Sequence, residues 1–564
     1  REINLRVFLS TTAILTIAEK LISKYDEFKR KSSKNDYEDL VLITKNLLEN
    51  RDAAQWVLYK LDGGIDHILV DEAQDNSGEQ WAIIRSLSEE FFAGFGAAGE
   101  KRTVFAVGDR KQSIYGFQGA NPGEFENMRQ YFSKKSQDFK TVSLDVSFRS
   151  TPQVLDVVNM VFKSENSKKG VAPENQTVEH LAHRVGQAGR VELWPILEAK
   201  EANVDEREEF DLPKAGASQE LAGKIAKRIK ETVLEKTYIP SRKRFASYGD
   251  FLILVQRRGQ FVAEFIRECK NRSIPIAGAD RIKLLDQIAV QDLLSLGKFL
   301  LLPVDDLSLA EVLKSPLFGL DDDDLTTLCA KRGNASLWSK LADFPQYREV
   351  YEYLQNLLNM TDFLRPYELY NRILSVDKKR IKFVERLGIE VEDGLNEFLN
   401  LTIEFEREHI PSLQEFIRWM EEDDVEIKRE TEQSEVNAVR IMTVHGSKGL
   451  QAPIVILPDT LRKPPAKRVM DLLVGDELYF PLCSADYADE CEKIYQKNQQ
   501  KAMDEYRRLL YVALTRAEDV LCICGFKKKN QKADDSWYNL CFEAMDKIAN
   551  PKEEILVSEA KEKN

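Results

Sequence analysis

The chain has 564 residues, of which 43% are hydrophobic and 31% charged, and its formal net charge is −13. This length is too great for one hydrophobic core, so we expect three or four domains, and the composition excludes a disordered chain. No run reaches the roughly 18–20 apolar residues of a membrane span, no export signal is visible, and the charge argues against a protein that coats duplex DNA by charge alone.

Short apolar runs rich in β-branched residues, each ending in a turn, predict buried parallel strands in α/β domains. Helical patterns, such as Glu79–Phe92 and Pro152–Val161, follow most of these runs. The runs are Ile65–Val70, Thr103–Val107, Thr141–Val146, Phe251–Val255, Val439–Val444, Pro453–Leu457 and Val520–Gly525.

The stretch from about 285 to 435 lacks such runs and predicts successive amphipathic helices, such as Val350–Asn359 and Asp393–Phe405. We interpret it as a helical domain inserted within an α/β domain. Its acidic tracts, Asp321–Asp324 and Glu421–Asp424, are expected on solvated faces or at helix starts.

The seven cysteines include no Cys-x-x-Cys pair, and Cys522 and Cys524 alternate along an apolar run. Buried, reduced thiols are therefore favoured over metal ligands, and we expect a cytoplasmic protein without disulfides. The tail from Lys527 is polar, rich in Lys and Glu, and resembles a linker. Because the chain begins with Arg1 and not Met, we expect a fragment.

Two adjacent carboxylates, Asp71 and Glu72, follow the apolar run Ile65–Val70. In α/β proteins the carboxyl ends of parallel strands are where ligands bind. One carboxylate there can hold Mg²⁺, and its neighbour can orient and deprotonate a water. Taken alone, the pair could equally be an acidic helix start without chemistry.

The segment Phe105–Ala120 also follows a predicted strand. Gln112 could sense a γ-phosphate, and Tyr115 and Phe117 offer flat faces for stacking nucleic-acid bases. In isolation, both rings could be ordinary core aromatics.

Two arginines, Arg149 after a strand and Arg516 in a helical pattern, could stabilise charge on a transferring phosphoryl group. A surface salt bridge is the alternative for either. The strand Val439–Val444 leads into a turn with His445, Ser447 and Lys448, which could contact a phosphate backbone or ATP, or hold a structural histidine.

In chain order, these segments resemble motifs II to VI of the UvrD-like, superfamily 1A DNA helicases. The similarity is greatest to the AddA helicase–nuclease subunits of bacterial double-strand-break repair complexes, and it includes Trp56–His67 and Ser536–Tyr538. The family implies two RecA-like domains, 1A and 2A, with ATP between them and single-stranded DNA across both. Insertions 1B and 2B interrupt these domains.

The resemblance implies a division of the chain into six segments. They are 1–35 (end of 1B), 36–140 (partial 1A), 141–284 (first part of 2A), 285–435 (helical 2B), 436–528 (second part of 2A) and 529–564 (linker towards a nuclease domain).

The resemblance also implies a role for each motif residue. Asp71 would hold Mg²⁺, Glu72 would activate water, and Gln112, Arg149 and Arg516 would meet the γ-phosphate of ATP. Gly449 and Gln451 would lie at the nucleotide, Tyr115 and Phe117 would stack on bases, and Thr443 and His445 would link the two sites. The implied activity is 3′–5′ movement on single-stranded DNA from duplex ends, with an AddB-type partner subunit.

The sequence departs from the family at three points. It has no Gly-x-x-x-x-Gly-Lys-Ser/Thr loop for ATP phosphates; the nearest imitation, Gly216–Ile225, has the wrong spacing and order. We also expect it to lack the nuclease domain of the AddA type, because the sequence stops in the predicted linker. Gln451 stands where Glu is usual, which puts a ribose contact in doubt.

These departures leave two alternatives to a repair helicase–nuclease motor. One is a non-catalytic DNA-binding or scaffold remnant, and the other is a UvrD-type repair helicase without a nuclease. Because the phosphate-binding loop is absent, we expect this chain alone to hydrolyse little ATP.

Overall fold

The structure, a computed structural model, divides the chain into two compact units: residues 1–277 together with 435–564, and residues 278–434. Most of the Trp56–His67 segment and part of the Glu421–Asp424 tract lie outside the described residues. The structure describes residues 2–49, 60, 65–92, 102–136, 138–173, 176–198, 216–277, 284–330, 333, 335–388, 391–422, 437–465, 471–487, 489–527, 534–548, 550–552 and 555–559.

An eight-stranded sheet forms the centre of the first unit. The strands lie in the order β10-β11-β9-β12-β15-β5-β18-β17, and all neighbours from β10 to β5 are parallel. This confirms the predicted α/β class. The strands are β5 (Arg190–Leu193), β9 (Phe251–Val255), β10 (Ile276–Ala277), β11 (Val439–Thr443), β12 (Ala452–Leu457), β15 (Ala517–Ile523), β17 (Asn550–Lys552) and β18 (Ile555–Glu559).

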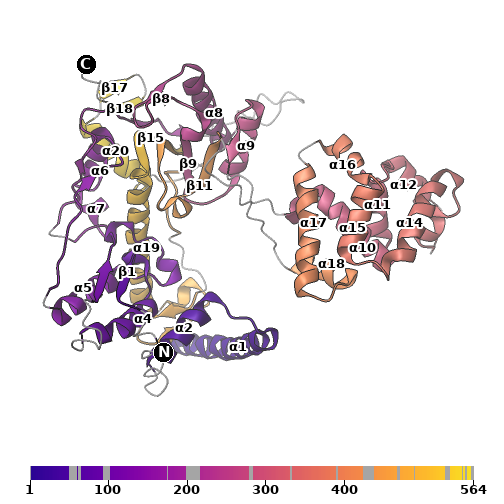
Figure 1. Cartoon of the computed structure of the whole chain (residues 1–564), viewed down its shortest axis with the longest axis horizontal. Helices are drawn as coiled ribbons and strands as arrows, with labels where there is room; N and C mark the ends of the chain where they lie inside the picture. The colour runs from indigo at the N-terminus through magenta and orange to yellow at the C-terminus, as the bar shows by residue number, and fades with distance from the viewer. Residues whose placement is uncertain are drawn as a thin grey trace. The chain divides into compact units, whose positions relative to one another are not determined.

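Helices cover both faces of this sheet (Figure 1). α8 (Ala217–Leu234) and α9 (Gln260–Asn271) pack together on one side, and α6 (Pro152–Val161) packs with α20 (Trp537–Ile548) on the other. Strands covered on both faces need apolar residues at every position, which is why β9 and β12 are continuous apolar runs. The seven cysteines are free thiols, and the two on or beside β15 are buried.

The tail does not form the linker expected from its composition. It contains α20, whose Trp537 is fully buried, and β18, which pairs antiparallel with β5. The polar composition was misleading because α20 needs only one apolar face, and a two-stranded addition to a sheet needs few apolar residues.

A smaller sheet carries the predicted carboxylates. β1 (His67–Val70) pairs in parallel with β2 (Thr103–Ala106). α4 (Gly78–Ser88) begins at a capping box in which the Ser77 hydroxyl accepts a hydrogen bond from the Gln80 amide. Neighbouring helices are α2 (Tyr37–Glu49) and α5 (Pro122–Lys135).

The strand predicted over Thr141–Val146 is mostly wrong. Only β3 (Val146–Ser147) forms, and it pairs with β4 (Leu181–Ala182). The residues before β3 are exposed, so their alternating apolar side chains have no covered face that would favour a longer strand.

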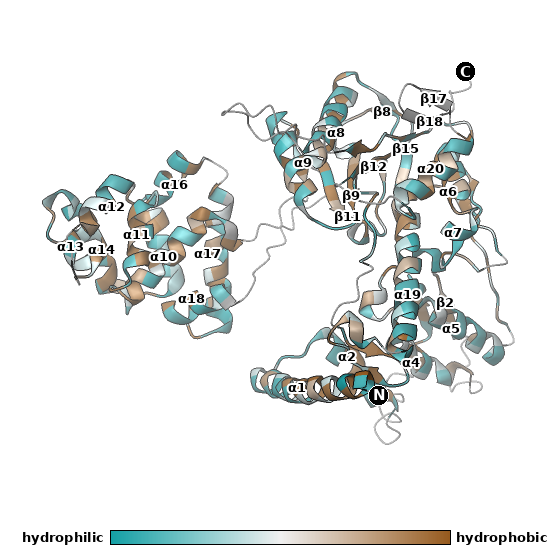
Figure 2. Cartoon of the chain, turned by 180° about the vertical axis from the view of Figure 1, so that it is seen from behind, coloured by the Kyte–Doolittle hydropathy of each residue, from teal (hydrophilic) through white to brown (hydrophobic). Residues whose placement is uncertain are grey.

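Two long helices complete this unit. α19 (Asp489–Leu514) contains the run leading to Arg516, and α1 (Glu2–Ser32) is joined to the β13–β14 hairpin (Leu473–Val474 and Leu478–Tyr479). The Ser10 hydroxyl of α1 donates to the Phe480 carbonyl at 2.6 Å. Hydrophobic residues nevertheless recur along α1 (Figure 2), and several of them are exposed; Phe8, for example, is 65% exposed.

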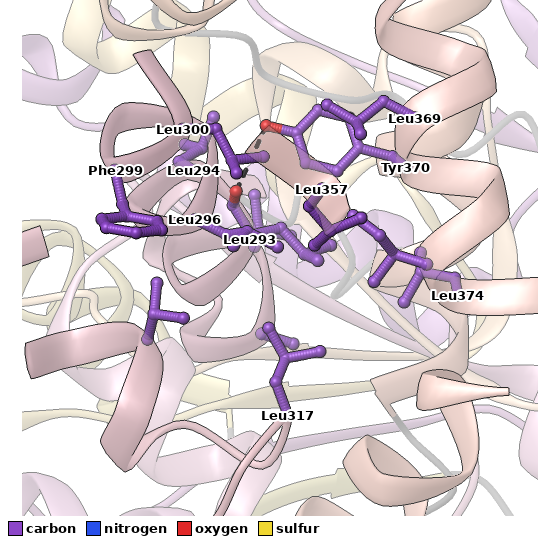
Figure 3. Close-up of a cluster of buried hydrophobic side chains, with 14 of the residues drawn as sticks. Leu293, Leu294, Leu296, Phe299, Leu300, Leu317, Leu357, Leu369, Tyr370 and Leu374 are labelled. Carbon is purple, nitrogen blue, oxygen red and sulfur yellow. Dashed lines mark hydrogen bonds between the residues drawn. The ribbon is translucent and has the colours of Figure 1, made fainter. Parts of the chain in front are cut away.

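The second unit is helical throughout its described residues. A single apolar core joins its helices, and in it the Tyr370 hydroxyl donates to the Leu293 carbonyl at 3.2 Å (Figure 3). Asp321 caps α12, as expected of an acidic tract at a helix start. The helices are α10 (Ile288–Leu301), α11 (Asp306–Lys314), α12 (Asp322–Cys329), α13 (Leu337–Leu341), α14 (Arg348–Thr361), α15 (Pro366–Asn371), α16 (Lys379–Leu387), α17 (Val391–Glu408) and α18 (Leu413–Glu422). Across both units, no helix of the described residues is long and apolar enough to span a membrane.

Candidate functional site

The two predicted carboxylates leave the carboxyl end of β1 and are both exposed. Glu72 has a left-handed backbone conformation, with φ of 48°, and its amide donates to Asp71 Oδ1 at 2.8 Å. Its own carboxylate accepts a hydrogen bond from Gln74 Nε2 at 2.5 Å. The turn therefore holds the Glu72 carboxylate in one place, as a group that must orient a water requires.

Gln74 joins the two motif segments of the small sheet, and this role was not predicted from the sequence. It is fully buried, and its Oε1 accepts a hydrogen bond from the Asp109 amide at 2.8 Å. A side chain at Gly108 would come within 2.7 Å of that same oxygen, so the contact requires glycine there. The position of Gln74, two residues after Glu72, was the available signal.

Gln112 and Arg516, predicted from segments about 400 residues apart, are in direct contact. Arg516 Nη2 donates to Gln112 Oε1 at 3.2 Å. Arg516 is 1% exposed, and its other donors bind the carbonyls of Val512 and Leu450. Burial, followed by the nearby charge of Arg149, lowers the pKa of Arg516 to about 10.

Arg149 lies beside Arg516 and contacts two neighbouring residues. Its Nη1 donates to the Thr515 carbonyl at 3.1 Å, and its Nε donates to Gln451 Oε1 at 2.6 Å. Burial lowers the pKa of Arg149, since a desolvated charge is less stable. Both guanidinium contacts are with neutral oxygens, which leaves the positive charge available to an anion.

Lys448 connects the large sheet to the carboxylates. Its Nζ lies 3.3 Å from Glu72 Oε2, forms an ion pair with Asp75, and donates to the Gln112 carbonyl at 2.9 Å. The Lys448 side chain is only 7% exposed. A phosphate contact was considered for this lysine from the sequence, but its pairing with Glu72 was not predicted.

The predicted base-stacking residues form one aromatic cluster with His445. The Tyr115 hydroxyl donates to the His445 carbonyl at 3.2 Å, and the Phe117 ring meets the His445 ring edge-on at 5.6 Å. Phe117 is 69% exposed, so its face is open to a ligand. Burial lowers the pKa of His445, which favours its neutral form near pH 7. Thr443 lies nearby, where its hydroxyl accepts from the Gly446 amide at 3.2 Å.

Two remaining sequence predictions concern glycine-containing segments. Gly449 is exposed with φ of +80°, a conformation that glycine adopts without strain, and it precedes Gln451. The imitation of a phosphate-binding loop is no loop, because Gly223 and Lys224 lie inside α8.

The chemistry of Asp71 fits a Mg²⁺ ion of the kind held by one or two protein carboxylates together with water and substrate phosphates. The described residues contain no cluster of three or more His, Cys, Asp or Glu side chains that would form an all-protein metal site. Any Mg²⁺ at Asp71 would therefore depend on water and on phosphate oxygens for most of its remaining ligands.

Residues 142–528 match the UvrD-like helicase C-terminal domain, and residues 9–133 match the UvrD/REP helicase N-terminal domain. The chain belongs to the UvrD-like helicase family. Asp71, Glu72 and Gln112 of this UvrD-like helicase lie in the N-terminal family domain, whereas Lys448 and Arg516 lie in the C-terminal one. The contacts of Arg516 with Gln112 and of Lys448 with Glu72 therefore cross from one family domain to the other.

Curated relatives of this UvrD-like helicase are ATP-dependent helicase/nuclease subunits of the AddA type. The protein from Lactobacillus helveticus is 28% identical over 93% of this chain and 45% of its own length, and the one from Bacillus pumilus is 27% identical with the same coverage. The protein from Leuconostoc mesenteroides is 24% identical over 92% of this chain and 43% of its own length. These findings confirm the predicted resemblance to AddA. The chain spans less than half the length of these relatives.

Proposed function

We propose that this chain is the motor of an ATP-dependent DNA helicase that moves 3′ to 5′ on single-stranded DNA within a double-strand-break repair helicase–nuclease. The observation that carries the proposal is the meeting of Arg516 with Gln112 and of Lys448 with Glu72 across the two family domains. Groups suited to phosphate and to water activation converge there from both sides.

In the proposed reaction Glu72 orients the attacking water and accepts its proton. Arg149 and Arg516 stabilise the negative charge that develops on the γ-phosphoryl group, and Gln112 senses whether that group is present. Mg²⁺, bound at Asp71, would neutralise charge on the phosphate oxygens. Gly449 and Gln451 lie at the nucleotide, where Gln451 orients Arg149.

The DNA site in this proposal is the aromatic cluster of Tyr115, Phe117 and His445, with Thr443 beside it. Lys448 supports the coupling of the two sites, because its Nζ pairs with Glu72 and also lies 5.3 Å from the centre of the Tyr115 ring. Movement of Lys448 on nucleotide binding would therefore change the surroundings of the Tyr115 ring, which belongs to the proposed stacking surface.

The names of the relatives support the wider setting. We assign residues 36–140 to domain 1A, the large sheet to 2A and the helical unit to 2B, with α1 as the end of 1B. The substrates are single-stranded DNA and duplex ends, the partner is an AddB-type protein, and the compartment is the cytoplasm, in keeping with seven free thiols.

One observation favours a second function. The sequence contains no Gly-x-x-x-x-Gly-Lys-Ser/Thr loop, so the chain alone should hydrolyse little ATP, and a DNA-binding scaffold would keep the aromatic cluster without turnover. Substantial DNA-stimulated hydrolysis by the isolated 564-residue chain would contradict the expectation that the chain alone hydrolyses little ATP.

The decisive experiment is Glu72→Gln in the full-length gene product. Loss of the general base should lower DNA-stimulated ATP hydrolysis by roughly 10²–10⁴-fold while sparing nucleotide binding. Glu79→Gln, which changes a neighbouring half-buried carboxylate in the first turn of α4, is the matched control and should leave turnover unchanged. Undiminished hydrolysis in Glu72→Gln would remove the motor proposal, and a wild type that binds DNA without hydrolysis would favour the scaffold.

A further inference from the structure

A buried ion pair contacts the backbone of Arg149. Arg184 Nη1 donates to the Arg149 carbonyl at 2.7 Å and to the Glu518 carbonyl at 3.2 Å, while its Nη2 pairs with Asp519. The Arg184 and Asp519 side chains are 9% and 2% exposed. Arg184 thus binds the backbone of Arg149 and of β15 with one nitrogen.

The residues after Arg149 are also attached to the start of β15. The Ser150 hydroxyl donates to the Ala517 carbonyl at 2.6 Å, and the Thr151 amide donates to the Glu518 carbonyl at 2.9 Å. Ala517 directly follows Arg516. The residues next to Arg149 are therefore hydrogen-bonded to the backbone next to Arg516. The positions of both guanidinium groups consequently depend on the backbone at the start of β15.

Asp519 is itself fixed from a third segment. Its Oδ2 accepts hydrogen bonds from both the amide, at 3.2 Å, and the hydroxyl of Ser241. A carboxylate held in this way cannot turn to follow Arg184, so Arg184 has one favoured position. Arg184 also follows β4, whose partner β3 leads directly into Arg149.

We propose that Arg184 and Asp519 are positioning residues that hold Arg149 in register with Arg516. The inference rests on the proposed function, in which both arginines meet the transferring phosphoryl group. A displacement of about 1 Å in a positioned group can cost about 10²-fold in rate, so the pair should affect turnover without touching the nucleotide.

The test measures DNA-stimulated ATP hydrolysis by the full-length gene product. Arg184→Gln should lower kcat by about 10- to 100-fold with the KM for ATP changed less than about 3-fold. In an Arg149→Gln background the same change should cause no further loss, because the group being positioned is already absent. A loss that multiplies in the double variant would overturn the proposal.

Arg242→Gln is the matched control. Arg242 donates to Glu518 Oε1 at 2.8 Å on the same strand, but its described contact is with the side chain and not with the Arg149 backbone. It should change kcat less than about 2-fold. An equal loss in Arg242→Gln would assign the effect to general weakening of β15 and would overturn the positioning role.

Arg184→Lys serves if Arg184→Gln fails to fold. It keeps a positive charge opposite Asp519 but loses the forked geometry that reaches two carbonyls at once. It should melt near the wild-type temperature, with kcat reduced several-fold; full activity in the folded variant would refute the inference. If Arg149→Gln alone leaves turnover intact, or the wild type shows none, the proposed function fails as well, which separates the two failures.

Discussion

The large sheet of the first unit and its small β1–β2 sheet differ in how their faces are covered. Every residue of β9 and β12 is buried, whereas Leu69 on β1 is 74% exposed and Phe105 on β2 is 60% exposed. Arg516 directly precedes β15 of the large sheet, and Arg149 contacts the adjacent Thr515, whereas the carboxylates follow β1 of the small sheet. The same apolar strand pattern can therefore belong to a strand covered on both faces or to one with an exposed face.

This contrast also separates two ways of fixing a side chain. Next to the large sheet, Arg516 is held by packing and by carbonyls of neighbouring segments. After β1 of the small sheet, Glu72 is held by its own turn and by Gln74. Lys448 of the other family domain forms an ion pair with it. The position of the carboxylates therefore depends on local hydrogen bonds more than on core packing.

Truncating one leucine in each sheet should give the largest difference. Leu254→Ala in β9 removes a fully buried side chain and should lower the free energy of unfolding by about 2–5 kcal/mol. Leu69→Ala in β1 should change it by less than about 0.5 kcal/mol. Urea unfolding followed by tryptophan fluorescence measures both, and similar losses would show that the open face of β1 is covered in solution.

Two exposed phenylalanines of the small-sheet region should differ in DNA binding. Phe117→Ala should weaken single-stranded DNA binding by roughly 5- to 150-fold, because stacking of a base on an aromatic ring contributes about 1–3 kcal/mol. Phe105→Ala, which removes a similarly exposed ring outside the aromatic cluster, should leave affinity unchanged. Fluorescence anisotropy with a labelled oligonucleotide distinguishes them, and equal affinities would detach the cluster from DNA.

The smallest expected effect concerns Asp459, which lies just after β12 of the large sheet. Burial raises its pKa to about 6, although its Oδ2 accepts from the Gln256 amide at 2.9 Å. With the folded pKa above the unfolded value of 3.8, stability falls as pH rises between these values and stays lower above pH 6. Asp459→Asn should therefore stabilise the chain by about 1 kcal/mol at pH 7.5, with the gain shrinking by pH 5. Thermal melts at both pH values test this, and a pH-independent difference would contradict it.

The sequence predicted the strands of the large sheet in which apolar residues predominate and missed β5. β9 and β12 follow from continuous apolar runs, β11 from a run interrupted by Arg440, and β15 from the apolar run after Glu518 and Asp519. β5 was missed because it contains Glu192, which is buried but neutralised by Arg190 and Arg228. A buried charge with partners from elsewhere in the chain leaves no local signal.

The candidate site shows the same division. Glu72, Gln112 and Arg149 were predicted because their motifs follow strands, and Arg516 because its helical pattern completes a familiar order of motifs. In the structure Arg516 contacts Gln112, and Arg149 contacts the adjacent Thr515. Arg184, in contrast, lies in an ordinary loop, and its contacts with Arg149 and Asp519 depend on how distant segments meet. Such supporting residues depend on the tertiary structure, and one sequence cannot reveal them.

The attachment of β18 to β5 has a practical consequence for dissecting the protein. A recombinant fragment ending at residue 528, where the family match stops, would turn β5 into an edge strand with unpaired backbone groups and would remove Trp537 from the core. Exposed edges of this kind promote aggregation between chains. Fragments for expression and crystallisation are better extended through residue 559, so that β5 keeps its pairing with β18.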